Sequence, residues 1–244
     1  MITFCIPSKN NLRYLKSCIP SIQNFSHYKN DILVFVDQDN DGTVEWLKEN
    51  NIEYILNEDS APKGIGYAYD TMFKAAKTDL VVAFHADMIL GHEADLHMVK
   101  YHKRGTVVCS TRIEPPLRPA GPEKIVKDFG LWPEDIDWNE FDSFVREQIK
   151  TNEDLYTNGL FAPWLIHKED HLGHDEIFLS VYEDADLFRR FKLAGYDTIQ
   201  SWSSLVYHLT CRGGQFEHAK EDKDFSTKSP EWEMKNYYSL LRVS

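Results

Sequence analysis

The stretch Leu80-Val-Val-Ala-Phe-His-Ala-Asp-Met-Ile-Leu90 decides the fold and offers the first functional residues. Its apolar run, Leu80–Phe84, predicts a strand that is buried on both faces, as in a parallel sheet. The strand ends at His85 and Asp87, and side chains two positions apart on a strand point the same way. Ligands of open α/β sheets bind at the carboxyl ends of the strands. Because imidazole and carboxylate groups bind divalent metals, we predict a metal site there that faces a phosphorylated ligand.

Apolar runs and helical periods alternate on the N-terminal side of this stretch. In chain order the predicted elements are strand 2–6, helix 12–22, strand 32–36, helix 44–47, strand 53–56 and helix 65–76. This alternation predicts an α/β fold in which helices flank a mostly parallel central sheet. Because parallel crossovers are right-handed, it also fixes most of the connections between the strands.

The pattern is less regular after about residue 101. Further strands are predicted at 106–111 and just before His208, and further helices at 142–149, 183–194 and 230–241. The proline-rich segment 114–122 predicts an irregular loop, and the polar segment 211–227 predicts a mobile one. We expect one continuous domain with three parts, residues 1–105, 106–210 and 211–244.

Composition and charge exclude several classes of protein. The 244 residues carry a net charge of -12, which argues against binding to bulk nucleic acid or to an anionic membrane. Four scattered cysteines, none with zinc-ligand spacing, indicate buried free thiols in a reducing compartment. No basic leader precedes Ile2, and no apolar run approaches the roughly 20 residues that span a bilayer. We therefore expect a cytoplasmic protein without a transmembrane segment.

Two segments allow both a functional and a structural interpretation. The acidic turn with Asp37, Asp39 and Asp41 follows a strand, where a carboxylate can bind a base or a ribose, but it also suits a capped turn before a helix. A calcium loop is disfavoured, because Lys48 stands where the bidentate glutamate belongs. The helix start Lys63–Gly66 fits either phosphate binding on its backbone amides or a plain glycine turn.

Three later features are also ambiguous by themselves. His208 ends a strand and is either a metal ligand or a buried structural histidine. Glu183 and Asp184 begin an amphipathic helix, where a carboxylate serves as a general base or complements the helix dipole. Trp164 is either a platform that stacks on a sugar or a core residue.

In combination these motifs resemble those of family 2 glycosyltransferases with a GT-A fold, over roughly residues 1–210. The matching segments are Ile6–Asn10, Val36–Thr43, Gly64–Asp70, Phe84–Asp87, Leu172–Phe178, Glu183–Leu187 with Arg190, Ala194–Tyr196, and His208. The main departure is His85, which stands in place of the first aspartate of the family's Asp-x-Asp motif. The Gln-x-x-Arg-Trp pattern of processive synthases is absent, so the resemblance implies transfer of a single sugar.

The resemblance implies a metal-dependent, inverting glycosyltransferase. Its donor would be a nucleotide-diphosphate sugar, with a UDP-sugar favoured, and its acceptor a hydroxyl group of a carbohydrate or another molecule. The implied metal is Mn²⁺ or Mg²⁺, bound by Asp87 and His208 with His85 as a third candidate, and the imidazoles favour manganese. Asp184 would be the general base, assisted by Glu183. The implied donor-binding residues are Pro7, Lys9, Asp37, Asp39, Lys63, Gly64, Asp70 and Ala86, and the implied acceptor-binding residues are Trp164 and Asn158.

The resemblance also gives the parts of the chain their roles. Residues 1–105 would bind the donor, residues 106–210 would bind the acceptor and supply the base, and the loop after His208 would close over the donor. Two alternatives stay open. A sugar-phosphate nucleotidyltransferase would need a glycine-rich, basic motif near the first strand, which Pro7–Asn10 does not supply. A non-catalytic domain that binds a nucleotide or a sugar would show the same motifs.

Overall fold

The computed structural model describes residues 1–117, 124–180 and 182–209. Its strands are β1 Thr3–Lys9, β2 Asp31–Gln38, β3 Glu53–Leu56, β4 Leu80–Ala83, β5 Met88–Leu90, β6 Thr106–Glu114, β7 Lys124–Val126, β8 Tyr156–Asn158, β9 Trp164–His167 and β10 Asp197–His208. Its α-helices are α1 Leu12–Phe25, α2 Thr43–Glu49, α3 Ile65–Ala75, α4 Ala94–Val99, α5 Trp138–Thr151 and α6 Glu183–Leu193, with 3₁₀ helices η1 Pro133–Asp135 and η2 Lys168–Asp170.

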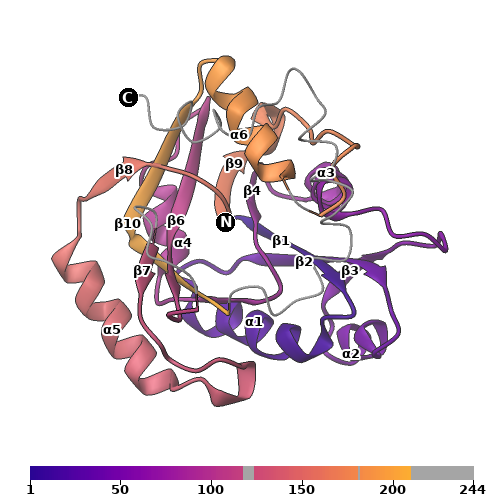
Figure 1. Cartoon of the computed structure of the whole chain (residues 1–244), viewed down its shortest axis with the longest axis horizontal. Helices are drawn as coiled ribbons and strands as arrows, with labels where there is room; N and C mark the ends of the chain where they lie inside the picture. Colours follow the sequence, from indigo (N-terminus) through magenta and orange to yellow (C-terminus); the bar gives the residue numbers. More distant parts are fainter. Residues whose placement is uncertain (118–123, 181, 210–244) are drawn as a thin grey trace.

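All the strands belong to one sheet, in the order β3-β2-β1-β4-β9-β6-β10-β5, with β7 beside β6 and β8 beside β10. Strands β1 to β4 pair in parallel, as the alternation of strands and helices predicts. The connections from β1 to β3 run one way across the sheet and the connection from β3 to β4 runs back. Right-handed crossovers therefore place α1 and α2 on one face and α3 on the other, and Figure 1 shows this arrangement around β1 and β2.

The second half of the sheet is mixed. Strand β9 lies antiparallel between β4 and β6, and β10 runs parallel to β6 but antiparallel to β5. The α/β fold with a mostly parallel N-terminal sheet and a mixed C-terminal part is therefore as predicted. Strand β9 is not among the predicted elements, because a run of four apolar or aromatic residues is too short to be assigned without knowing the two strands that pair with it.

The stretch 80–90 forms two strands where the sequence predicts one. Strand β4 ends at Ala83 and β5 begins at Met88, and the residues between them form a turn in which the Met88 amide donates to the His85 carbonyl at 3.2 Å. His85 and Asp87 therefore lie in a turn, and the prediction that they share one face of a strand is wrong. Their proximity, described below, comes from the turn itself.

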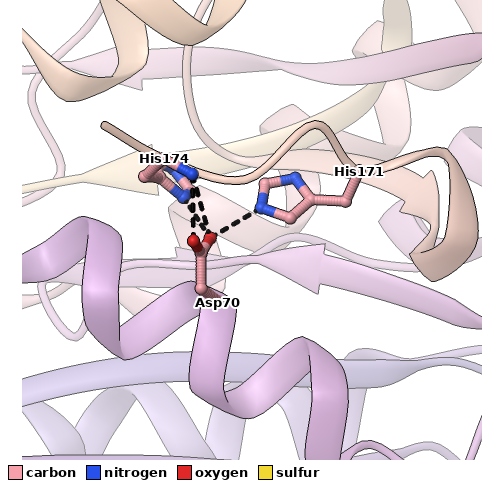
Figure 2. Close-up of side chains that lie close together, drawn as sticks. All are labelled: Asp70, His171 and His174. Carbon is pink, nitrogen blue, oxygen red and sulfur yellow. Dashed lines mark hydrogen bonds and ion pairs between the residues drawn. The ribbon is translucent and has the colours of Figure 1, made fainter. Parts of the chain in front are cut away.

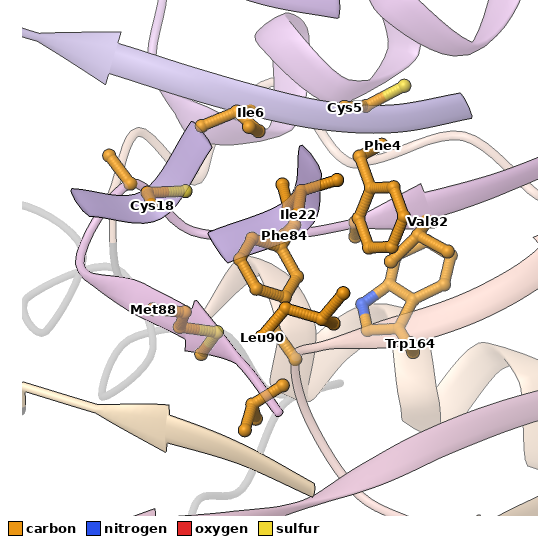
Figure 3. Close-up of a cluster of buried hydrophobic side chains, with 14 of the residues drawn as sticks. Phe4, Cys5, Ile6, Cys18, Ile22, Val82, Phe84, Met88, Leu90 and Trp164 are labelled. Atoms are coloured by element: carbon orange, nitrogen blue, oxygen red, sulfur yellow. The ribbon is translucent and has the colours of Figure 1, made fainter. Parts of the chain in front are cut away.

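A continuous apolar core lies beneath this turn. Phe4 and Phe84 meet edge to face with ring centroids 5.4 Å apart, and Figure 3 shows both beside Trp164. Cys5, Cys18 and Cys109 are buried free thiols, as predicted, and the remaining cysteine, Cys211, lies outside the described residues. The core places the turn 84–87 on a rigid base.

Some of the remaining predicted elements are found in the structure, and others lie outside the residues that it describes. The helices predicted at 142–149 and 183–194 correspond to α5 and α6, and the short strand before His208 is the end of the longer β10. The loop 211–227 and the helix 230–241 lie outside the described residues. Among the described helices, none has the length and the apolar character that crossing a membrane requires.

Candidate functional site

A pocket of about 730 Å³, part of it open solvent, lies where β1, β2 and β4 end. Its lining includes seven residues that the sequence predicts for the site: Pro7, Lys9, Asp37, Gly64, His85, Ala86 and Asp87. The carboxyl ends of neighbouring parallel strands meet at one edge of a sheet, so residues that are distant in sequence converge there. The location of the pocket is therefore the one predicted from the sequence.

His85, Asp87 and His208 form a group whose ligand atoms all lie within 4.8 Å of one another. The pairing of β10 with β5 sets His208 opposite Met88, and the Leu209 amide donates to the Asp87 carbonyl at 3.0 Å. These contacts bring His208 Nε2 to 3.5 Å from Asp87 Oδ2. The sequence predicts all three residues but not the strand pairing that unites them.

The chemistry of this group fits a divalent metal ion. Asp87 Oδ2 is buried and faces His208 Nε2 at 3.5 Å, so a carboxylate oxygen and an imidazole nitrogen lie where one cation could bind both. Burial lowers the pKa of His85 to about 4, which keeps its imidazole neutral and able to act as a ligand. Two imidazoles and one carboxylate suit manganese and other first-row transition metals.

Glu114 is a functional candidate that the sequence analysis misses. The parallel pairing of β6 with β10 sets Ile113 beside Tyr207, so Glu114 reaches His208 at the ends of the two strands. Glu114 Oε1 lies 2.9 Å from His208 Nδ1, and Lys124 donates to Oε2 at 2.6 Å. Burial opposes these charges, but the carboxylates of Asp87 and Glu114 raise the pKa of His208 to about 9.

The contact between Glu114 and His208 resembles those in which a carboxylate orients a metal-binding histidine. Such a partner holds the proton on Nδ1, leaves Nε2 for the metal and makes the imidazole a better ligand. A sequence signal exists in hindsight, because Glu114 ends a strand parallel to the strand that ends at His208. It could be used only once the pairing of the two strands was known.

We expect Glu114→Gln to weaken Mn²⁺ binding about 10- to 100-fold, the usual effect of removing such a partner. Glutamine keeps the size of the side chain but loses the charge that fixes the His208 tautomer. Titration of Mn²⁺ followed by electron paramagnetic resonance measures the free ion directly. Glu134→Gln, at an exposed glutamate paired with Arg13, is the control and should bind Mn²⁺ like the wild type. Unchanged affinity in Glu114→Gln would contradict the orienting role.

Asp184 and Glu183 lie in the first turn of α6, the second predicted part of the site. Glu183 is buried, and Asp184 Oδ1 accepts the Ala185 amide at 2.7 Å. Burial raises the pKa of Asp184, which moves this carboxylate toward the range of a general base at neutral pH. Burial also raises the pKa of Tyr69, and the charges of Glu183, Asp87 and Asp184 raise it further. The proposed base and the metal group therefore both lie within electrostatic reach of this one tyrosine.

The helix start at Lys63 and Gly64 is organised by Asp37 and not by free amides. The amides of Lys63 and Gly64 donate to the Asp37 carboxylate at 2.8 and 3.1 Å, and the Ile65 amide donates to the Leu179 carbonyl at 2.8 Å. The predicted phosphate site on these amides is therefore wrong. The ammonium group of Lys63 pairs with the exposed Asp59, and its role beside a phosphate stays a prediction.

Gly64 itself is required by its surroundings. Its φ of +87° suits glycine, and a Cβ atom there would lie 2.4 Å from the Leu179 carbonyl oxygen. This close approach brings the segment before α6 against the start of α3, where Leu179 also lines the pocket. The glycine therefore shapes the pocket by allowing two backbones to meet.

Asp39 and Asp70 do not line the pocket, contrary to their prediction as donor-binding residues. Asp39 is exposed and accepts the Val44 amide at 3.2 Å in the first turn of α2, so the interpretation as a capped turn holds. Asp70 accepts hydrogen bonds from His171 and His174, at 2.7 and 2.6 Å. Burial opposes its charge, but these hydrogen bonds outweigh it and hold the pKa of Asp70 well below its usual range.

The two predicted acceptor residues are placed away from the site. Trp164 is 1% exposed, packed against Phe73 and the His171 ring, so it has no face for a sugar and the core interpretation holds. Asn158 pairs with Ile199 at the start of β10, whereas His208 ends that strand. The register of β10 shifts between Ser201 and Leu205, so the β6 partners of Ile199 and Tyr207 are Val108 and Ile113, roughly 17 Å apart along the sheet. Asn158 therefore does not lie beside His208.

Two further residues extend the site beyond the prediction. Ser8 lines the pocket, and its hydroxyl oxygen is buried without a hydrogen-bond partner among the described residues. Arg112, near the end of β6, lies 3.8 Å from Glu114. Burial lowers the pKa of His85 and the charge of Arg112 adds to this effect, whereas for Asp184 burial raises the pKa and Arg112 opposes the rise. Arg112 is therefore a cation close to both halves of the site.

Solved structures with a similar fold are glycosyltransferases. Three of them are GalNAc-T7 with UDP, GalNAc and Mn²⁺, the mannosyltransferase PcManGT from Pyrobaculum calidifontis with GDP-Man and Mn²⁺, and residues 1–349 of S. aureus TarS. GalNAc-T7 aligns with a TM-score of 0.64 at 14% identity, over 85% of this chain and 43% of its own length. PcManGT aligns with a TM-score of 0.61 at 14% identity, over 98% and 67%, and TarS with 0.53 at 11%, over 82% and 60%.

These alignments establish the GT-A fold, while the chain spans less than half the length of GalNAc-T7. No curated protein matches the chain in sequence. The family model described as "Glycosyl transferase family 2" matches residues 3–155, which is more than half of the 244 residues. The matched region includes the pocket edge at Pro7–Lys9, the turn 84–87 and Glu114. The chain therefore belongs to glycosyl transferase family 2.

Proposed function

We propose that the chain is a metal-dependent, inverting glycosyltransferase that moves one sugar from a nucleotide-diphosphate sugar to a hydroxyl acceptor. The observation that carries this proposal is the group His85, Asp87 and His208, which borders the pocket at the carboxyl edge of the sheet. Two similar structures hold a nucleotide or nucleotide sugar together with Mn²⁺, which supports the same ligand classes here. A UDP-sugar and Mn²⁺ are the donor and the metal that we favour.

The residues of the chain take separate roles in this reaction. Asp87, His208 and His85 would hold the divalent ion, which supplies charge to stabilise the departing nucleoside diphosphate. Asp184 accepts the proton of the acceptor hydroxyl, with Glu183 beside it. The acceptor oxygen then forms a bond to the anomeric carbon on the side opposite to the leaving group, while the bond from that carbon to the diphosphate oxygen breaks. The sugar is transferred with inversion, and the proton remains on Asp184.

The pocket lining provides the contacts for the donor. Pro7, Lys9, Asp37, Gly64 and Ala86 line it, and the Asp37 carboxylate is held by the backbone at the start of α3. We assign donor binding to residues 1–105, and the base and the acceptor contacts to residues 106–210. A hexosyl donor and a cytoplasmic location stay predictions.

A thermal-shift screen of nucleotide sugars, with and without Mn²⁺, tests the proposal. Ligands that bind the folded state raise the melting temperature, so a UDP-sugar should stabilise the chain only when the metal is present. Transfer or hydrolysis of the stabilising donor, measured as released nucleoside diphosphate, should follow. Metal-dependent binding with neither activity would favour a non-catalytic binding domain instead.

A further inference from the structure

A second group of metal-binding side chains lies outside the pocket. Asp70 belongs to α3, whereas His171 and His174 follow η2, about a hundred residues later in the chain. Figure 2 shows both imidazole rings directed at the Asp70 carboxylate. Asp70 Oδ1 lies 2.7 Å from His171 Nε2 and 2.6 Å from His174 Nδ1, and the three ligand atoms lie within 4.8 Å of one another.

The surrounding structure holds the three side chains in place. The His171 ring meets Phe73 edge to face with centroids 4.8 Å apart, and the His174 ring stacks on Tyr69 at 5.8 Å. The backbone amide of His174 donates to Asp70 Oδ2 at 3.0 Å, which fixes the carboxylate. A Cβ atom on Gly66 would lie 2.7 Å from His174 Cβ, so the glycine permits this close approach to α3. The side chains of His171 and His174 are 7% and 3% exposed, and that of Asp70 is 24% exposed.

We propose that Asp70, His171 and His174 bind a zinc ion that fastens the segment 171–180 to α3. Two imidazole nitrogens and a carboxylate oxygen are typical zinc ligands, and three protein ligands leave one position for water. Tetrahedral ligands about 2.0–2.1 Å from zinc lie roughly 3.3 Å apart, so each nitrogen moves away from Oδ1 by less than about 1 Å. The ion replaces the hydrogen bonds that now join the imidazoles to Asp70.

The position of this group indicates which part of the chain the zinc ion would order. The segment 171–180 continues to Leu179 and Ser180, which line the pocket, and Leu179 accepts the Ile65 amide at the start of α3. Helix α6 with Glu183 and Asp184 follows directly. An ion at Asp70 therefore orders the backbone that forms one wall of the pocket and leads to α6. This inference does not depend on the proposed sugar transfer.

The ligands should contribute unequally. Zinc bound at His171 Nε2 places the ring proton on Nδ1, which is buried and has no hydrogen-bond partner among the described residues. An unpaired buried donor is costly. His171→Gln should therefore lose less zinc affinity than His174→Gln or Asp70→Asn.

The test uses the full chain with the pocket group disabled by Asp87→Asn and His208→Gln. After removal of metal by a chelator, we expect this variant to bind one zinc ion more than the same variant carrying Asp70→Asn, counted by equilibrium dialysis. Zinc should also slow hydrogen exchange of the backbone amides in 171–180 by at least about tenfold, as expected of a segment that a ligand orders. Cobalt, as a substitute ion, should give the absorption bands of a tetrahedral site, and Asp70→Asn should abolish them.

Glu176→Gln is the matched control, because it removes an exposed acid from the same segment and should bind zinc normally. If Asp70→Asn does not fold, the exchange measurement on the chain with an intact Asp70 still decides the question. Zinc that leaves exchange in 171–180 unchanged would overturn the proposal and leave a hydrogen-bonded cluster. Because no donor or acceptor is present in these measurements, their outcome is independent of whether the chain transfers a sugar.

Discussion

Sugar transfer by Asp184→Asn is expected to be about 10²- to 10⁴-fold slower than by the wild-type chain, which is the usual contribution of a general acid or base. Asparagine has nearly the same size and keeps an oxygen for the Ala185 amide, which Asp184 Oδ1 accepts at 2.7 Å. It cannot take the proton of the acceptor hydroxyl. Steady-state rates at saturating donor and acceptor measure this loss as a lower kcat.

The pH dependence separates a general base from a structural carboxylate. A base works in its deprotonated form, so the rate should rise with pH through the pKa of Asp184 and then level off. Burial raises that pKa, so the rise should occur above the ordinary range of an aspartate. Asp184→Asn should remove this acidic limb from the profile as well as lowering the plateau.

Asp186→Asn is the matched control for the first turn of α6. It removes the same charge from the same end of the helix, but the Asp186 carboxylate pairs with Arg190 at 2.7 Å. Its effect should appear in the melting temperature, with kcat within a few-fold of the wild type. Equal rates in Asp184→Asn and the wild type would remove Asp184 from the reaction and reduce its role to complementing the helix dipole.

The N-terminal half of the fold follows from local patterns. The period of 3.6 residues in α1 and α3 and the unbroken apolar run in β4 depend on neighbours in the sequence, so they can be read directly. Strand β9 is different, because Trp164–His167 becomes a strand only through pairing with β4 and β6 on its two sides. The sequence could not decide whether Trp164 is a sugar platform or a core residue for the same reason, since its burial depends on helices and strands from elsewhere in the chain.

The site is predicted best where the chain alone brings residues together. Asp87 and His85 are two residues apart, so they lie close together in a turn as well as on a strand. Their proximity was therefore predicted correctly, although the predicted reason, a shared strand face, was wrong. Glu114 and His208 meet through the register of β6 and β10. Asp70 meets its histidines across 101 and 104 residues. No periodicity carries such information, so the orienting glutamate and the second histidine group became visible only in three dimensions.

Asp87→Asn should weaken Mn²⁺ binding by at least about 100-fold, because loss of a carboxylate that only supports a ligand already costs 10- to 100-fold. Asp87 is the anionic member of the group, and its buried Oδ2 lies 3.5 Å from His208 Nε2. Asparagine replaces a charged oxygen by an amide that binds hard cations weakly. Titration of Mn²⁺ by electron paramagnetic resonance measures the affinity, and metal-dependent stabilisation by the nucleotide sugar should disappear with it.

Two further substitutions serve as the control for Asp87→Asn and as the test of His85. Asp39→Asn changes the same functional group on an exposed residue that does not line the pocket, so its Mn²⁺ affinity should match that of the wild type. His85→Gln decides whether the residue that departs from the family's Asp-x-Asp motif is itself a ligand. A loss as large as that of Asp87→Asn would make His85 a direct ligand, whereas a small loss would leave the ion to Asp87 and His208. Tight Mn²⁺ binding by Asp87→Asn would show that the metal is held elsewhere, and the proposed role of the whole group would fail.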